Sequence, residues 1–180
     1  RDCLLSRGLG DVYKRQSREF AFSKSTGRPA VLNTKPNDSY TFEGASLLVD
    51  GYHSRPVFTS GAWLGYLDEP LDVTIDMGGE QSYRSVELET LAEKGDWIFP
   101  PSSVTVWVSD NGTDFTEVAS VTVPEAKAGD ADGIGRYRMQ FPETSARYLK
   151  VVAQNAAAIP AWHPGAGSKG FLFVDEIVVE

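Results

Sequence analysis

The sequence predicts an all-β fold, a β-sandwich or jelly roll of eight or so short strands. Three observations predict it: apolar and polar residues alternate with period two along most of the chain, turn residues recur between these segments, and no segment sustains the 3.6-residue period of a helix. Short strands separated by turns at regular spacing are typical of sandwiches and jelly rolls. The one helical turn expected is short and covers residues 44–49.

The alternating segments begin near Pro29 and give the expected strands. The clearest are residues 71–76, 86–89, 104–108, 137–141, 148–152 and 171–179. Turn sequences separate them: Met-Gly-Gly at 77–79, Asp-Asn-Gly at 110–112, Asp-Gly at 132–133 and Gly-Ala-Gly at 165–167. Because the Asp-Asn-Gly sequence lies directly between two strand-like segments, it is the strongest hairpin signal in the chain.

Composition excludes several classes of protein. The 180 residues are 41% hydrophobic, enough to bury the core of one domain, and no run approaches ~18 apolar residues, so no membrane-spanning helix is expected. The net charge of −8 argues against nucleic-acid partners, which are bound largely through Lys and Arg. A single Cys excludes an internal disulfide and a zinc site built from several thiolates.

The first sixteen residues differ in character from the rest of the chain. Residues 6–16 resemble a translated sequencing adapter, so we expect 1–16 to be an artefact at the edge of a metagenomic fragment; the alternative is a genuine basic N-terminal arm. The segment lacks the apolar stretch of a signal peptide. Without it the chain has 13 basic and 23 acidic residues, a net charge of −10, and no Cys. We expect residues 17–28 to be a linker from an absent upstream domain and 29–180 to be the folded module.

Aromatic residues gather in three segments between strands, at 51–66, 92–101 and 156–170. Aromatic rings on loops suit sugar recognition, because the apolar face of a pyranose stacks on a ring while polar groups bind its hydroxyls. Trp162, between two prolines, is the best candidate for an exposed platform. The alternative is that the rings cap the core, which we expect of Trp63. Trp107 lies mid-strand, where it either packs on a second face or is exposed, and it is not expected to form a site.

Signals for catalysis are weak. Adjacent acidic residues, such as Asp175 and Glu176, would point to opposite faces of an extended strand and not across a cleft. No GxSxG or phosphate-binding glycine loop occurs, and the two histidines, His53 and His163, suit polar loop contacts better than a metal site. A hard cation fits better, since Asp50 in a tight turn and Glu176 could supply carboxylate oxygens to Ca²⁺, completed by loop carbonyls.

Several stretches together resemble the F5/8 type C (discoidin-like) family, which overlaps with a family of carbohydrate-binding modules. They are LVDG at 48–51, GAWLGY at 61–66, VTIDMG at 73–78, PPSSVTVWVSDNGTDFTEVA at 100–119, ARYLKVVAQN at 146–155 and FVDEIVV at 173–179. Their order and spacing match, and the resemblance covers residues 29–180. GDWIFPP at 95–101 and the stretch 159–177 resemble, more narrowly, the C-terminal module of Bacteroidota-type β-N-acetylhexosaminidases, whose catalytic barrel lies upstream.

This resemblance implies an eight-stranded jelly-roll β-sandwich of the galactose-binding-domain-like type, with ligand loops at one end and a structural calcium. Asp50 matches the family's calcium-binding Asp, and Glu176 matches its Glu near the last strand. The backbone carbonyls of Leu48 and Tyr52 are the implied further donors. Ser54 lies near the position of a hydroxyl ligand, although the residues that follow it depart from the pattern.

The resemblance also implies a sugar site formed by loops 52–66, 92–99 and 156–169. Sugar-binding members use a His, an Arg–Asn pair and a late aromatic residue; the middle loop here has neither Arg nor Asn, so a galactose-type site does not carry over. Trp162 matches the late aromatic. The expected site therefore stacks a sugar on Trp162 and Trp97, with polar contacts from His163 and Asp96.

The leading hypothesis is a noncatalytic carbohydrate-binding accessory module of a glycoside hydrolase, the parent being a β-N-acetylhexosaminidase. The expected partners are a glycan containing N-acetylhexosamine or galactose and the upstream catalytic domain in cis, in a secreted, periplasmic or cell-surface bacterial protein. One alternative is a structural module docked on the catalytic barrel without binding a ligand. A phospholipid-binding member would carry a terminal disulfide and basic residues, and an autonomous enzyme would need catalytic groups; neither, nor any nucleic-acid or membrane partner, is expected.

Overall fold

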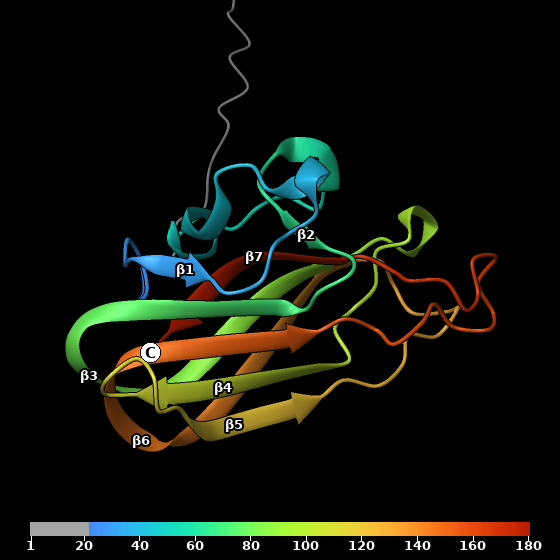
Figure 1. The fold of residues 1–180 in the computed structure, drawn as a ribbon. Helices are drawn as coiled ribbons and strands as arrows, with labels where there is room; N and C mark the ends of the chain where they lie inside the picture. Colours follow the sequence, from blue (N-terminus) through green and yellow to red (C-terminus); the bar gives the residue numbers. More distant parts are fainter. Residues whose placement is uncertain (1–21) are drawn as a thin grey trace, which may run out of the picture.

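The computed structural model describes residues 22–180, so the expectations for residues 1–16 and for the start of the linker fall outside the described residues (Figure 1). The regular structure of the described part is mainly antiparallel β-strand. Its strands are β1 (Ala30–Leu32), β2 (Leu64–Tyr66), β3 (Leu71–Ala92), β4 (Ser103–Ser109), β5 (Thr116–Thr122), β6 (Gly133–Gln154) and β7 (Leu172–Val179). Four short 3₁₀-helices accompany these strands: η1 (Asp38–Tyr40), η2 (Gly44–Val49), η3 (Phe58–Ser60) and η4 (Lys94–Asp96).

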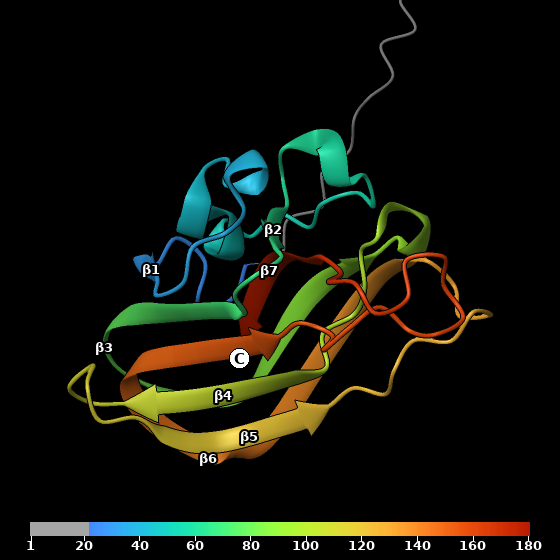
Figure 2. The same cartoon turned by 45° about the vertical axis from the view of Figure 1, so that its right-hand side comes forward.

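Two long strands, β3 and β6, build both layers of a sandwich. Their hydrogen-bonded order with the other strands is β2-β7-β3-β6-β4-β5, with β1 on β3. The first half of β3 and the second half of β6 pair with each other and with β1 and β4, whereas their other halves pair together beside β7. Figures 1 and 2 show both strands bending from one layer into the other. The predicted all-β sandwich is confirmed.

The strand count differs from the prediction because the chain bends where we expected turns. Segments 71–76 and 86–89 are two parts of β3, and segments 137–141 and 148–152 are two parts of β6. Within β3 the pairing moves from Asp76 with Tyr148 to Gln81 with Ala146, which leaves an irregular segment at 77–80. Gly78 has a φ of 81°, a value that glycine adopts without strain. The Met-Gly-Gly sequence therefore kinks one strand and does not join two.

The core lies between the two layers and follows the alternation read from the sequence. Its central members are fully buried: Val73, Ile75, Leu88, Val104, Val106, Leu149, Val151 and Ile177. Full burial of such a side chain is worth about 1.5–3 kcal/mol relative to exposure. The well-packed layers give the loops at the strand ends a rigid base.

Two local predictions hold. β4 and β5 form the expected hairpin, in which the Asn111 side-chain oxygen accepts hydrogen bonds from the backbone N–H groups of Thr113 and Asp114, each at 2.9 Å. Gly112 in this turn has a φ of 75°. The expected helical turn at 44–49 is η2.

The described part of the predicted linker lies along β7. Ser25 is buried, and its hydroxyl donates to the carbonyl of Ile177 at 2.6 Å, while the backbone N–H of Lys24 donates to the carbonyl of Val179 at 3.0 Å. Lys24 and Ser25 thus attach this segment to the last strand. In residues 22–180 no helix is both long and apolar enough to span a membrane.

Candidate functional site

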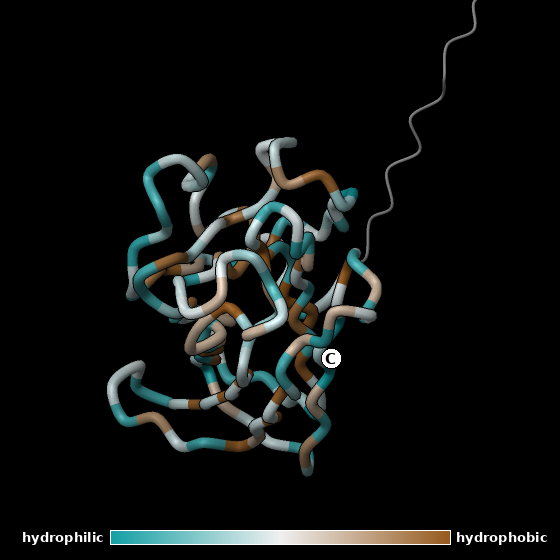
Figure 3. The backbone as a smooth tube through the Cα atoms, turned by 90° about the vertical axis from the view of Figure 1, so that its right-hand side faces the viewer, coloured by the Kyte–Doolittle hydropathy of each residue, from teal (hydrophilic) through white to brown (hydrophobic). Residues whose placement is uncertain are grey.

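Three loops gather at one end of the sandwich. They follow β3 (93–102), β5 (123–132) and β6 (155–171), and they lie together on the right of Figures 1 and 2. Figure 3 faces this end and shows apolar and polar segments interleaved there. Two of these loops contain all four residues that we expected to contact a ligand, Trp97, Asp96, Trp162 and His163.

The loop after β3 forms a tight turn that holds Trp97 outward. The backbone N–H of Glu93 donates to the carbonyl of Ile98 at 3.1 Å, and that of Ile98 returns the bond to Glu93 at 3.2 Å. Trp97 adopts the left-handed conformation, with a φ of 64°. Such a backbone costs a non-glycine residue about 1–3 kcal/mol and recurs at ligand sites. The Trp97 side chain is 42% exposed.

His163 ties this loop to the loop after β6. Its Nδ1 accepts the backbone N–H of Gly165 at 3.0 Å, so Nε2 carries the proton and donates to the carbonyl of Lys94 at 2.9 Å. The side chain is only 8% exposed. Both ring nitrogens are therefore engaged by the backbone, which leaves none for the ligand contact expected of His163. Its observed role is to position the loops.

Both tryptophans make edge-to-face contacts with the His163 ring. The ring centroids of Trp97 and Trp162 lie 6.0 and 5.5 Å from that of His163, with interplanar angles of 89° and 82°. Trp162 is 39% exposed, and its Nε1–H donates to the carbonyl of Ala126 at 2.9 Å. Trp97 lies against the backbone of Gly165, where a Cβ would come within 2.8 Å of the indole. We call Trp97, His163 and Trp162 the loop platform.

A buried lysine joins the third loop to this platform. The Nζ of Lys94 is paired with the carboxylate of Asp132 and donates to the carbonyl of Asp130 at 2.9 Å. Hydrogen bonding from Lys94 lowers the pKa of Asp132 below its usual value. Loop 123–132 was not anticipated, because Asp132-Gly133 looks like ordinary turn chemistry and nothing local indicates that its carboxylate reaches Lys94.

Asp96 is exposed beside Trp97, as a hydrogen-bond acceptor for a ligand must be. It also acts on its neighbour: burial raises the pKa of Glu93, and the charges of Asp96 and Asp132 add to the effect. The first loop therefore presents carboxylate oxygens next to the exposed indole of Trp97.

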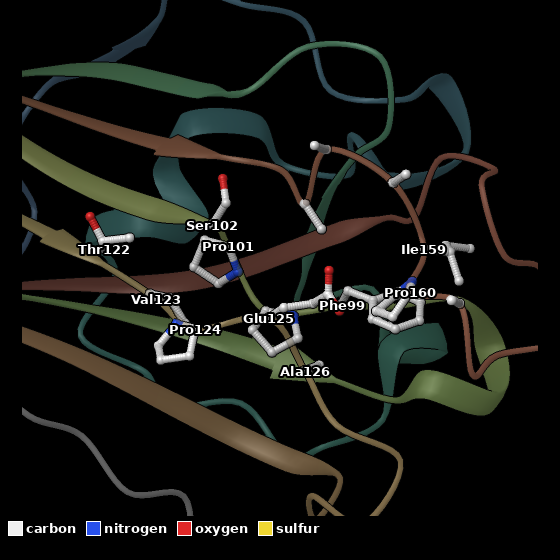
Figure 4. A pocket seen from close by; sticks show the side chains of 15 residues that line it. Phe99, Pro101, Ser102, Thr122, Val123, Pro124, Glu125, Ala126, Ile159 and Pro160 are labelled. Atoms are coloured by element: carbon white, nitrogen blue, oxygen red, sulfur yellow. The ribbon is translucent and has the colours of Figure 1, made fainter.

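Residues that neighbour the platform in the chain line an apolar groove of about 400 Å³. Figure 4 shows the side chains that line it. Its walls come from the segment before β4, the segment after β5 and residues 156–161, and include Pro100, Pro101, Val123, Pro124, Ile159 and Pro160. Phe99 lines it and lies 6.4 Å from the Trp162 ring, between centroids. The proline and alanine residues of this groove carry no functional signal in the sequence, and only the fold brings them together.

The aromatic residues of loop 52–66 belong mostly to the core, which is the alternative that we considered for loop aromatics. Trp63 is fully buried as predicted, and its Nε1–H donates to the carbonyl of Arg55 at 3.0 Å. Tyr66 is fully buried as well, and Phe58 packs against Tyr40 and Phe173. This loop therefore adds no exposed ring to the platform.

The acidic residues of β7 do not point to opposite faces, contrary to the expectation for an extended strand. The pairing with β3 shifts between Leu88 and Thr90, so Asp175 and Glu176 both lie opposite Glu89 in a bulge. Asp175 accepts the backbone N–H of Ser54 at 2.8 Å, and Glu176 accepts that of Gly51 at 3.1 Å. Both carboxyl groups thus reach the same loop.

The predicted cation ligands Asp50, in that loop, and Glu176, on β7, lie next to each other. Burial raises the pKa of Glu176 to about 9, and the neighbouring Asp50 and Asp175 contribute. Its Oε1 is buried with no hydrogen-bond partner in the described residues, whereas Asp50 is exposed and accepts the N–H of Tyr52 at 2.7 Å. A buried carboxyl oxygen without a partner, beside a second carboxyl group, fits a hard cation.

A cation bound by Asp50 and Glu176 would need backbone carbonyl oxygens as further ligands. Among residues 22–180, no group of three or more His, Cys, Asp or Glu is arranged to hold a metal. The carbonyls of Leu48 and Tyr52 therefore remain the predicted further donors. His53 is engaged elsewhere: its Nδ1 lies 3.0 Å from a carboxylate oxygen of Glu89, in keeping with a polar loop contact.

The comparisons with known proteins agree with the fold. The family model described as F5/8 type C domain matches residues 33–169, most of the chain. No curated protein matches.

Similar solved structures include CpGH89CBM32-5 from Clostridium perfringens in complex with GalNAc-β-1,3-galactose, which is 16% identical with a TM-score of 0.58 over 91% of this chain and 99% of that one. Chitosan-binding module 1 from a chitosanase/glucanase of Paenibacillus sp. IK-5 is 18% identical with a TM-score of 0.56, over 89% and 99% of the two chains. Chitosan-binding module 2 of the same enzyme, in complex with chitotriose, is 18% identical with a TM-score of 0.54, over 87% and 98%. At these identities the likeness concerns the fold.

Proposed function

This chain belongs to the F5/8 type C domain family, and on that premise we propose that it is a noncatalytic carbohydrate-binding module that serves a glycoside hydrolase as an accessory domain. The observation that carries the proposal is the loop platform, in which two partly exposed indoles pack edge-to-face with one buried imidazole. Support comes from the structural neighbours, which include a module in complex with GalNAc-β-1,3-galactose and one in complex with chitotriose.

The platform suits a sugar because it combines apolar ring faces with exposed oxygen acceptors. Trp97 and Trp162 offer the ring faces on which a pyranose stacks, and Asp96 offers carboxylate oxygens to its hydroxyl groups. His163 and Lys94 act indirectly, by joining the loops that hold these residues. Because the indoles are already fixed in the free protein, little conformational entropy is lost when a ligand binds.

The ligand that we propose is a glycan containing N-acetylhexosamine or galactose. The apolar groove beside Trp162 supports the first of these, since its proline and alanine walls suit the methyl of an N-acetyl group. The proposed parent is a β-N-acetylhexosaminidase with its catalytic domain upstream, acting outside the bacterial cytoplasm. The motifs at 95–101 and 159–177 support this parentage.

We also propose that Ca²⁺ binds beside β7. Asp50 and Glu176 would hold it with the carbonyls of Leu48 and Tyr52, all hard oxygen donors. The cation would neutralise two neighbouring carboxyl groups, one of them buried, and would fasten the loop at 48–54 to the last strand. Its role is structural, since the loop platform is built from other residues.

The test is glycan binding by the full chain. A glycan array is followed by isothermal titration of the best binder against the wild type, Trp162→Ala and Trp97→Ala, with Val57→Ala as a control for an exposed apolar side chain. We expect each tryptophan variant to bind at least about tenfold more weakly, ~1.4 kcal/mol, and the control to bind as the wild type does. Equal affinities for all four proteins would refute the platform.

A second candidate function is a structural docking module without a ligand, and the apolar groove is the observation that favours it. Absence of binding to every glycan on the array, and in titrations up to about 10 mM, would leave docking as the better hypothesis.

A further inference from the structure

A second hollow lies on the outer face of the sandwich, on strands and not on the loop platform. It has a volume of about 460 Å³ and is lined by Asp72, Thr105, Trp107, Thr113, Phe115, Lys150, Val152 and Gln154. None of these residues lines the groove beside Trp162 or belongs to the platform. We call this hollow the sheet groove.

Strand register explains why these side chains face outward together. Val152 of β6 lies between Asp72 of β3 and Thr105 of β4, and Lys150 lies in the same way beside Trp107. Their neighbours along each strand are buried in the core, so these residues point away from it. The groove therefore crosses three strands, a width of about 10 Å at the usual strand spacing.

One wall is fixed by the hairpin between β4 and β5. Its Phe115 ring lies under the ammonium group of Lys150, 4.3 Å from the nitrogen to the ring centroid. Such a cation–π contact is attractive and restrains both side chains. Two aromatic residues, Trp107 and Phe115, thus line one hollow on a rigid sheet.

The polar side chains around these rings have unused hydrogen-bonding capacity. Within residues 22–180, no hydrogen bond engages the indole N–H of Trp107, the side-chain amide of Gln154 or the hydroxyl of Thr105. The charges of Asp72 and Lys150 are opposite in sign, so the lining gives no preference for a charged ligand. Free donors and acceptors around apolar rings match a molecule that is rich in hydroxyl groups and has apolar faces.

We infer that the sheet groove is a second glycan site, which binds an internal stretch of an extended, neutral oligosaccharide. The choice of a glycan rests on the proposed function, whereas the location does not. An open groove across a sheet accepts a chain that continues at both ends, while a platform on loops suits a short sugar. The sequence did not indicate this site, because a tryptophan in mid-strand is as compatible with packing as with binding.

The test follows the four indole N–H signals of the ¹⁵N-labelled full chain by NMR, each assigned with its Trp→Phe variant. Trp63 is an internal control, because it is buried and bonded to Arg55. The probes are cellohexaose, mannohexaose and N-acetylchitohexaose up to about 10 mM. We expect at least one to shift the Trp107 signal and leave that of Trp63 in place.

Variants separate the two sites. Trp107→Ala should abolish binding at the sheet groove, while the signals of Trp97 and Trp162 still respond. Gln154→Ala, at an exposed position where folding is not at risk, should weaken binding there about tenfold, ~1.4 kcal/mol.

The outcomes are distinct. If the platform signals respond and that of Trp107 stays unmoved with every probe, the sheet groove is refuted and the proposed function stands. A response of Trp107 alone supports the groove and counts against the platform. If neither the Trp107 signal nor the signals of Trp97 and Trp162 shift with any probe, both glycan sites are refuted.

Discussion

Replacing Gly165 by alanine should displace the indole of Trp97 and weaken glycan binding with little loss of stability. A Cβ at this position would lie 2.8 Å from two atoms of the indole and 3.2 Å from a third. The ring edge must therefore retreat by roughly 0.6–1.2 Å to regain ordinary contact at 3.4–4 Å. Trp97 is partly exposed, so it can swing outward, and we expect a cost below the ~1–3 kcal/mol of an overpacked core.

The displaced ring leaves its place beside His163, where it is one of the two exposed rings of the loop platform. The affinity for the glycan selected on the array should fall about tenfold, ~1.4 kcal/mol, close to the effect of Trp97→Ala. Isothermal titration measures the affinity, thermal unfolding measures stability, and the indole N–H signal of Trp97 reports the movement directly.

Gly95 supplies the matched control. It lies in the same loop as Trp97 and has an ordinary backbone conformation, and a Cβ on this residue would have no heavy atom within 4 Å beyond its chain neighbours. Gly95→Ala should leave affinity, melting temperature and the Trp97 signal unchanged. A Gly165→Ala variant that binds glycan like the wild type, with its Trp97 signal in place, would show that the position of this ring does not matter.

Three further predictions concern stability. Calcium should raise the melting temperature and EDTA should lower it, because a calcium concentration of a hundred times Kd adds about 2.7 kcal/mol to the free energy of unfolding. Glu176→Gln should remove this effect. A melting temperature that neither reagent changes would refute the calcium site. The lowered pKa of Asp132 means that its bond with Lys94 stabilises the fold above the usual carboxyl pKa of 3.8 and is lost as pH falls through the lower folded value. Urea unfolding should therefore show Lys94→Met closer to the wild type at pH 2 than at pH 7, and an equal gap at both would contradict the pairing. Asn111→Ala should destabilise the β4–β5 hairpin by about 1 kcal/mol, because the turn loses the acceptor for two backbone N–H groups; Thr116→Ala, in the adjacent exposed strand, should change less.

The fold was predictable because its main determinant is local. Alternation in β3, β4 and β6 follows directly from one buried and one exposed face, and the β4–β5 turn carries its own signal. The bend at Gly78 was not predictable, since the same Met-Gly-Gly sequence can reverse a chain or kink it. The outcome depends on how β6 pairs on either side, and that pairing is set by residues about 70 positions away.

The residues of the candidate site could be proposed from the sequence, whereas the contacts that they make could not. Trp162 could be proposed because it lies between two prolines in a glycine-rich segment, and Trp97 because it lies in an aromatic-rich segment between strands. The role of His163 could not, since it depends on the carbonyl of Lys94, which is distant in the sequence. The shared orientation of Asp175 and Glu176 depends on a bulge that alternation alone does not reveal.

The passage of β3 and β6 through both layers has a consequence for how the domain folds. Neither layer can form alone, because each needs one half of the same two strands, so unfolding should be a single cooperative transition. The pairing that completes the sandwich joins Leu71 to Ala153, which are far apart in the chain. The chain between these residues loses conformational entropy before the contacts between the two strands form. Folding is therefore slow, and we expect refolding on the scale of milliseconds to seconds.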